Sequence, residues 1–351
     1  MRKERHVEIA GQQLHLTEVF DAYWRFAAER QRIFFNRVFH RPVSLTTDPI
    51  LSQYKFTNAY RASDRVSQYL IKHVIYRDDL PASDEEVFFR IILFKLFNKI
   101  ETWELLEHTI GDLVLSNFDF GAYDHALSQA MRKGIRIYSA AYIIPSCGNV
   151  FGHELKHQNH LKLIDWMLEQ DFPKKIASSN SMEGAYETML GAPSIGSFLA
   201  YQFITDINYS EITSFCEDTF VVPGPGALDG VSKCFKSDDK LDPEACIKYM
   251  YEHQDQWFSI LGEEFQSLWD RKLQLIDCQN LFCEISKYAR VAFPAIAGVS
   301  GRTRIKQKFS HQRPLPPPWY PPKWGLNDKI AQSLEGVSIS PIAAETQMDL
   351  F

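Results

Sequence analysis

The sequence lacks any apolar run long enough to cross a bilayer, and no signal-type apolar core follows its charged first residues. Its six cysteines form no Cys-x-x-Cys pair, the spacing used by many zinc and iron–sulfur sites. A P-loop of the form Gly-x-x-x-x-Gly-Lys-Ser/Thr is also absent. We therefore expect a cytoplasmic protein with free thiols, no metal, no cofactor and no membrane contact.

A strong excess of one charge is lacking as well. The 38 Lys and Arg against 44 Asp and Glu give a net charge of −6, which argues against a wholesale polyanion binder. A local basic surface stays compatible with this balance, because the field depends on where charges lie. In contrast, 45% of the 351 residues are hydrophobic and 13% are aromatic. The chain can thus bury a large core, which excludes general disorder and small disulfide-stapled folds.

Helical periodicity dominates the sequence. Thr17 is a candidate cap for a helix that continues to about Phe39, and Ser83 begins a capping box before a second apolar face. Clean strand patterns are scarce; residues 135–144 are the best strand candidate, and one strand makes no sheet. We therefore predict a mostly α fold. Further helices are expected over residues 123–133, 153–170, 182–189, 243–250 and 256–268.

Prolines concentrate near the C-terminus, where residues 313–324 contain six of them. Such a segment cannot form a helix and should run extended over the surface. Trp319 and Trp324 are typical of anchors that dock the segment onto its own domain, and a ligand for SH3-type domains is the alternative. We predict a helical module over residues 1–310, followed by a proline-rich docking segment and tail over residues 311–351.

A literal His-Glu-x-x-His extends from His153 to His157. On a helix the two histidines would share one face and could bind zinc, with the glutamate activating water. Lys156 inside the motif, and the absence of an obvious third ligand beyond Glu183 or Glu187, favour a solvated helix instead. A zinc peptidase is therefore the least favoured of the functions considered.

Two stretches combine glycines with the start of a helix. The first, within residues 186–206, predicts a helix, a tight turn and a second helix, which is the pattern of a helix–hairpin–helix motif. Free amides in the first turn of such a helix can bind a DNA phosphate without reading sequence, and a purely structural αα-hairpin is the equal alternative. The second stretch is Gly224-Pro-Gly226, a loop that opens another helix. The predicted DNA contacts of the two stretches are Gly191, Ser194, Ile195, Gly196, Ser197, Gly224 and Gly226.

Charged residues flank these turns. Asp218 follows the hairpin at a spacing that suits an acid beside a flipped nucleotide, and Asp206 is the second candidate. Solvated loop acids are the alternative for either one. A basic run supplies the best stripe of phosphate contacts in an otherwise acidic chain. Its predicted DNA-binding residues are Arg302, Arg304, Lys306 and Lys308.

Two polar motifs lie far apart in the chain, and each combines hydrogen-bonding side chains with neighbouring rings. We expect them to converge on one cleft opposite the hairpin and to hold an extruded base, because a site built to pair polar groups rejects analogues that lack them. The alternative is an internal network that ties the first and last helices together. The predicted base-pocket residues are Asn58, Tyr60, Arg61 and Asp64 in the early motif, and Gln279, Asn280 and Glu284 in the late one.

Short strings in a fixed order resemble a known family over about residues 40 to 310. It is the helical family named for the alpha-glutamyl/putrescinyl thymine pyrophosphorylases and the helical domain of 5-hydroxymethyluracil DNA kinases. The resemblance implies a fold related to helix–hairpin–helix DNA glycosylases, with double-stranded DNA that carries modified pyrimidines as the substrate. The strings are Asp48-Pro-Ile-Leu, Phe56-Thr-Asn-Ala-Tyr-Arg-Ala-Ser-Asp-Arg, Phe97-Asn-Lys, Ile195-Gly-Ser-Phe-Leu-Ala-Tyr-Gln, Asp206-Ile-Asn-Tyr-Ser, Gly224-Pro-Gly-Ala, Asp277-Cys-Gln-Asn and Cys283-Glu-Ile-Ser-Lys-Tyr.

The resemblance implies two activities. The first expectation is an anti-phage DNA glycosylase that flips out a bulky pyrimidine, such as glucosylated hydroxymethylcytosine, and leaves an abasic site. Ser197 stands where lyase-type glycosylases have a lysine, so a water-using mechanism with Asp218 or Asp206 is favoured. The alternative is a transferase that replaces pyrophosphate on activated 5-hydroxymethyluracil with an amine or amino acid. No protein partner is expected.

Overall fold

The computed structural model describes residues 5–41, 45–140, 144–310 and 315–336. Within these ranges the protein is mostly helical, as predicted, with one small three-stranded sheet. Residues 311–314 of the predicted docking segment, and the tail from residue 337, lie outside the described ranges. No helix in the described part of the chain is both long and apolar enough to cross a membrane.

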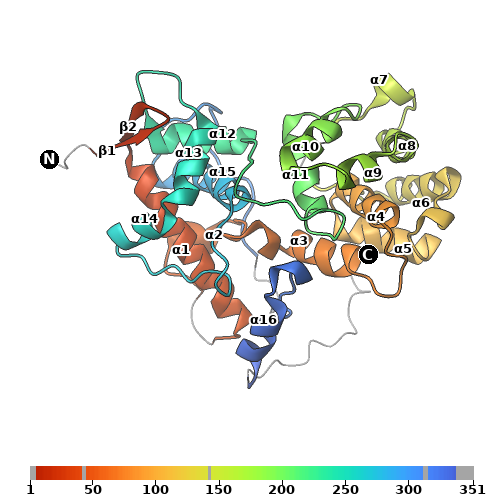
Figure 1. Cartoon of the computed structure of the whole chain (residues 1–351), viewed down its shortest axis with the longest axis horizontal. Coiled ribbons are helices and arrows are strands. Elements are labelled where there is room, and N and C mark those ends of the chain that lie inside the picture. Colours follow the sequence, from red (N-terminus) through yellow and green to blue (C-terminus); the bar gives the residue numbers. More distant parts are fainter. Residues whose placement is uncertain (1–4, 42–44, 141–143, 311–314, 337–351) are drawn as a thin grey trace.

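The helices form two lobes, which lie left and right in Figure 1. The first lobe contains β1 (His6–Ile9), β2 (Gln12–Leu16), α1 (Glu18–Val38), α2 (Pro49–Gln53), α12 (Pro225–Cys234), β3 (Phe235–Lys236), α13 (Pro243–Glu252), α14 (Gln254–Ile260) and α15 (Leu275–Ala292). The second lobe contains α3 (Arg65–Leu70), η2 (Ile71–Ile75), α4 (Asp84–Phe97), α5 (Ile100–Ile110), η3 (Leu115–Asn117), α6 (Phe120–Arg132), α7 (Gly148–Phe151), α8 (Lys156–Glu169), α9 (Phe172–Ala177), α10 (Met182–Leu190) and α11 (Ser197–Ile207). The first lobe is therefore assembled from two distant parts of the chain.

Helix α15 is the centre of the first lobe, where it packs against α1, α12 and α13. Gly230 allows α12 to approach it closely, because a Cβ at this position would lie 2.1 Å from the carbonyl oxygen of Phe282. The antiparallel sheet has the order β1-β2-β3 and pairs Leu16 with Phe235. The sheet thus joins the N-terminal hairpin to the residues that follow α12.

Helix α4 is the centre of the second lobe, and every residue from Val87 to Phe97 is buried. Apolar residues surround this helix instead of forming one stripe, which is typical of a helix enclosed by others. Ser83 caps its start by accepting a 3.4 Å hydrogen bond from the Glu86 amide. Asn98 ends it in the left-handed region, with a φ of 49°. Helices α8, α9 and α11 pack around it.

Two segments cross between the lobes, residues 54–64 on the way out and residues 208–224 on the way back (Figure 1). The outward crossing contains the short helix η1 (Arg61–Ser63). The C-terminal segment lies against this crossing, since Tyr320 is fully buried and its hydroxyl lies 2.7 Å from that of Ser63.

The C-terminal segment also contacts the return crossing. The Lys323 ammonium, in η4 (Pro322–Trp324), donates to the carbonyl oxygens of Ser210 and Thr213, each at 2.6 Å. The Trp324 ring lies 3.8 Å from the Arg271 guanidinium. The segment is followed by α16 (Asn327–Leu334), so this part of the C-terminus fastens one crossing to the other.

The helix starts predicted after Thr17 and Ser83 are confirmed. The strand predicted over residues 135–144 is wrong where it is described, because residues 135–140 contain no strand. The N-terminal hairpin was not predicted from the sequence, because its two-residue turn, Ala10-Gly11, is not one of the Asn-Gly, Asp-Gly or Gly-Gly pairs that indicate such turns. Both residues have positive φ, 50° and 75°. The helix predicted over residues 256–268 ends early, at Ile260.

The Thr17 hydroxyl offers a direct test of how α1 is fixed. It accepts from the Val19 amide at 3.1 Å and donates to the Lys233 carbonyl at 2.5 Å, so it caps α1 and ties it to the end of α12. Thr17→Val should lower the free energy of unfolding by about 1–2 kcal/mol, because it leaves two buried polar groups unpaired. Urea denaturation measures this, with Thr17→Ser as the control that keeps the hydroxyl. Equal stability of Thr17→Val and wild type would contradict the role of the cap.

Candidate functional site

The predicted hairpin is formed by α10, a tight turn and α11. Ser194 adopts a φ of 61°, and Gly196 is an extended cap that offers no side chain to the first turn of α11. Ile195 is buried and its amide donates to the Ala192 carbonyl, so this residue stabilises the turn from inside. The other predicted contacts of the turn, Gly191, Ser194, Gly196 and Ser197, are exposed.

The start of α12 meets the start of α11. Gly224 caps α12, and a Cβ at Gly224 would lie 2.6 Å from the ring of Phe198 in the first turn of α11. A Cβ at Gly226 would lie 3.0 Å from the Cys283 sulfur, and one at Gly224 would lie 3.3 Å from Nε2 of Gln279. The two glycine-capped helix starts therefore converge from different lobes beside α15.

The basic run is an exposed segment that follows the first lobe without regular structure. The described side chains of Arg302, Arg304, Lys306 and Lys308 are all exposed. At one end the Ser300 amide donates to Asp229 in α12 at 2.7 Å.

Further along, the basic segment is fastened twice more. The Arg290 guanidinium donates to the Arg304 carbonyl at 3.2 Å. The Lys55 amide donates to the Gln307 carbonyl at 3.1 Å, beside a bridge between Tyr54 and Lys308. The cations are thus presented along a line from α12, past the end of α15, to α2.

The early and late polar motifs do come together in the structure. The Thr57 amide donates to Glu284 at 2.9 Å, and the Asn280 amide group donates to the Thr57 hydroxyl at 3.1 Å. The Arg61 amide donates to Asp277 at 2.8 Å. Segments separated by most of the chain are therefore joined by direct hydrogen bonds where the outward crossing meets α15.

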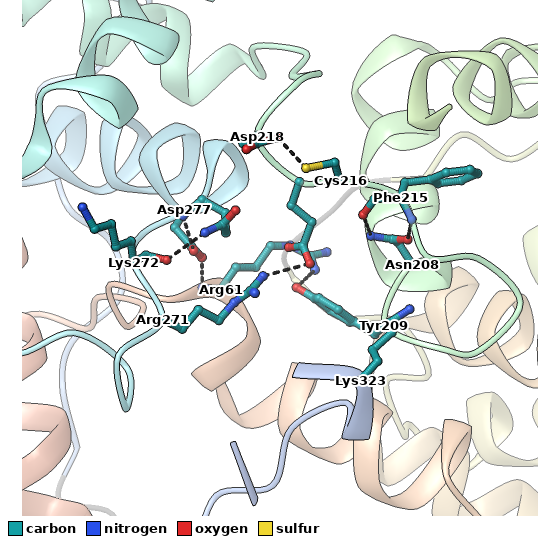
Figure 2. A network of polar contacts seen from close by, with 12 residues as sticks. Arg61, Asn208, Tyr209, Phe215, Cys216, Asp218, Arg271, Lys272, Asp277 and Lys323 are labelled. Carbon is teal, nitrogen blue, oxygen red and sulfur yellow. Dashed lines mark hydrogen bonds and ion pairs between the residues drawn. The ribbon is translucent and has the colours of Figure 1, made fainter. Parts of the chain in front are cut away.

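The Arg61 side chain belongs to an internal network, which is the alternative considered for these motifs. Its guanidinium donates to Asp206 at 2.7 Å and Gln202 at 3.1 Å, and only 3% of Arg61 is exposed. It also donates to the Tyr209 hydroxyl at 2.9 Å (Figure 2). Lys95 lies 3.1 Å from the other Asp206 oxygen. Burial opposes ionisation of Asp206, but the charges of Arg61 and Lys95 hold its pKa below the ordinary value.

The two candidate acids occupy different environments. Asp206 has no exposed surface, so solvent and DNA do not reach its carboxylate. Asp218 lies in the return crossing, is partly exposed, and accepts from the Cys216 thiol (Figure 2). It also accepts from the Tyr251 hydroxyl at 3.3 Å. Tyr60 is also internal, because its hydroxyl donates to the Arg271 carbonyl at 2.6 Å.

Sequence patterns assigned no site role to several charged groups at this junction. Glu217 pairs with Arg271 at 2.9 Å, and burial raises the pKa of Glu217. Burial also raises the pKa of Asp277 to about 6. Arg30 of α1 donates to the Thr57 carbonyl and the Asn58 side chain. In the sequence, the one sign of the Arg30 contact was a cation next to the apolar face of the helix that follows Thr17.

The His-Glu-x-x-His string does not form the geometry that zinc requires. Helix α8 begins at Lys156, so His153 precedes it, and His157 is buried against Asp124 at 2.7 Å. Glu183 and Glu187 are exposed on α10. Within the described ranges no group of three His, Cys, Asp or Glu side chains is arranged to hold a metal. The predicted solvated helix is also wrong in part, since His157 is fully buried.

Comparison with known proteins identifies relatives over most of the chain. A family model described as "5-hmdU DNA kinase, helical domain" matches residues 17–298. The 5-hmdU DNA kinase of Bacillus phage SP10 is 24% identical over 288 residues, which cover 77% of this chain and 45% of the relative. The chain thus spans less than half the length of that protein. No solved structure matches.

Replacement of Arg61 separates a structural network from a ligand pocket. Arg61→Met keeps much of the volume but leaves Asp206 with one cation fewer, so the free energy of unfolding should fall by about 3–5 kcal/mol. Arg65→Met is the matched control, because Arg65 has a side chain that is 59% exposed and pairs at 3.6 Å, and it should cost less than about 1 kcal/mol. Guanidinium denaturation measures both. A fully stable Arg61→Met protein would contradict the network and favour the pocket.

Proposed function

Since the chain belongs to the family of the 5-hmdU DNA kinase helical domain, we propose that it alters the 5-substituent of a modified pyrimidine in DNA. The carrying observation is that the family match extends over residues 17–298, and so includes the hairpin, both crossings and both polar motifs. The relative's name supports hydroxymethyluracil in DNA as the substrate class. This favours the transferase over the glycosylase, which the sequence analysis had placed first.

The reaction that we propose is a substitution at the methylene carbon of an activated 5-hydroxymethyluracil. The nitrogen of an amine or amino acid forms a bond to this carbon, the bond between carbon and the diphosphate oxygen breaks, and pyrophosphate leaves with the electron pair. The nitrogen gives up one proton. The printed sequence contains no P-loop, so we assign it the substitution and not the phosphorylation that would precede it.

The proposed mode of DNA binding uses two kinds of phosphate contact. The exposed amides at the start of α11, beside Gly196 and Ser197, suit a DNA phosphate, because the glycine cap has no side chain to bind them. The start of α12 differs from the expectation from the sequence, since Gly224 is buried and Pro225 has no amide hydrogen. The basic segment that contains Arg304 and Lys306 supplies charge along a second line. The order of α10, turn and α11 supports a fold related to helix–hairpin–helix glycosylases.

Base extrusion follows from the chemistry, since the 5-substituent must reach side chains inside the protein. The partly exposed residues of the junction, Asn58, Asp64 and Asn280, are the ones that we propose to face the base. Arg61, Tyr60 and Gln279 are buried and support them from behind.

Product analysis tests this function. DNA that carries diphosphorylated 5-hydroxymethyluracil, incubated with the protein and a polyamine or amino acid, should yield a heavier nucleoside by mass spectrometry and one pyrophosphate per modified base. DNA with unmodified thymine is the control. Release of a free base with alkali-labile abasic sites would support the glycosylase instead. Unchanged DNA with every modified substrate would contradict both activities.

The salt dependence of DNA binding tests the basic segment. Replacing both Arg304 and Lys306 with alanine should make the slope of log K against log salt less steep by about 1.8, because each lost phosphate contact removes about 0.9. Lys133→Ala, an exposed cation just beyond α6 in the second lobe, should leave the slope unchanged. Fluorescence anisotropy over a salt series measures this. An equal slope for the double variant and wild type would exclude the segment from the interface.

A further inference from the structure

Asp64 occupies an unusual position at the junction of the outward crossing and α3. It is the cap residue of α3, yet its side chain makes no capping hydrogen bond to that helix. Instead, one carboxylate oxygen accepts from the Asn58 amide at 2.8 Å. This is the one side-chain hydrogen bond of Asp64 within the described ranges, and the residue is partly exposed. Because Asp64 does not accept the hydrogen bond that a capping aspartate usually accepts, one of its carboxylate oxygens is free to accept a proton.

Charged groups from three elements act electrostatically on this carboxylate. Arg30 of α1 donates to the Asn58 side chain at 3.0 Å, and Arg61 of η1 has its guanidinium directed at Asp206. Glu284 of α15 lies opposite and pairs with Lys287 at 2.8 Å. The cluster is therefore polar and fixed in place by backbone contacts, with Asp64 at its partly exposed edge.

Burial and the neighbouring charges together favour the protonated form of Asp64 more than in an ordinary aspartate. Burial is the largest cause and raises the pKa of Asp64 to about 7, with Glu284 adding to it. The hydrogen bond from Asn58 and the charges of Arg30 and Arg61 act in the opposite direction. A carboxylate with this pKa can both take up and release a proton near neutral pH.

We propose that Asp64 is the proton acceptor of the reaction site, which rests on the proposed substitution at the 5-methylene carbon. As the amine nitrogen bonds to that carbon and pyrophosphate departs, the nitrogen transfers its proton to the free Asp64 oxygen. Solvent then removes the proton and restores the carboxylate. Asn58, Arg30 and Glu284 act as positioning residues that hold the carboxylate and set its proton affinity.

This role has a cost for the folded state. The folded pKa lies above the ordinary value of 3.8, so the folded protein binds a proton that the unfolded chain releases. The contribution of Asp64 to stability is therefore greatest below pH 3.8 and is lost as pH rises towards 7. A neutral side chain of the same shape avoids this loss, which is the pattern of a residue kept for function at the expense of stability.

Asp64→Asn tests the proposal, because asparagine keeps an oxygen for the Asn58 amide but cannot accept the proton. We expect the maximal rate of substitution to fall about 100-fold or more, with the affinity for DNA unchanged. The wild-type rate should rise with pH to a plateau, with its midpoint near 7, and Asp64→Glu should retain part of the rate. Asp112→Asn, an exposed carboxylate in the second lobe, is the matched control and should behave as wild type.

Two measurements are independent of activity. Carbon NMR of the full chain, assigned with Asp64→Asn, should show a carboxyl that titrates near pH 7. Asp64→Asn should melt at a higher temperature than wild type at pH 8, and this gain should shrink towards pH 4. An Asp64→Asn protein with wild-type rate, or a carboxyl that titrates near pH 4, would overturn the role of Asp64 alone. Absence of product with the wild-type protein would contradict the proposed function as well.

Discussion

The relative position of the two lobes depends on one buried arginine. The backbone of Arg61 is bonded to Asp277 in the first lobe, and its side chain is paired with Asp206 in the second. Removing such charges from water is unfavourable unless every donor and acceptor is matched. Gln202 and Tyr209 complete the match, so that this arrangement is specific to one orientation of the lobes.

The candidate site inherits its geometry from this junction. Helix α11 carries the hairpin amides and the Asp206 that binds Arg61, whereas α15 carries Asn280 and Glu284. Because both helices are fixed to the same crossing, the hairpin turn before α11 and the polar cluster around Asp64 are held in a constant relation. A change at Arg61 should therefore alter both, because its side chain binds α11 and its backbone binds α15.

Local features were predictable from sequence because their causes are local. The helices that begin after Gly196 and Gly224 were predictable because glycine is a common turn and cap residue and a helical pattern follows each one. The meeting of the early and late motifs was also predicted, since both have the side chains of a shared polar interior. Burial was not predictable: Asp206 and Asp218 look alike in the sequence, and only packing encloses one and exposes the other.

The order of the elements sets the order in which the protein can fold during synthesis. The second lobe is continuous, from α3 to α11, and its contacts are complete once that stretch has emerged from the ribosome. Helix α1 and the β1–β2 hairpin leave the ribosome before the second lobe, yet their partners β3 and α15 leave after it. Helix α1 and this hairpin are consequently enclosed later than the second lobe that follows them, and during this interval their apolar side chains are accessible to chaperones.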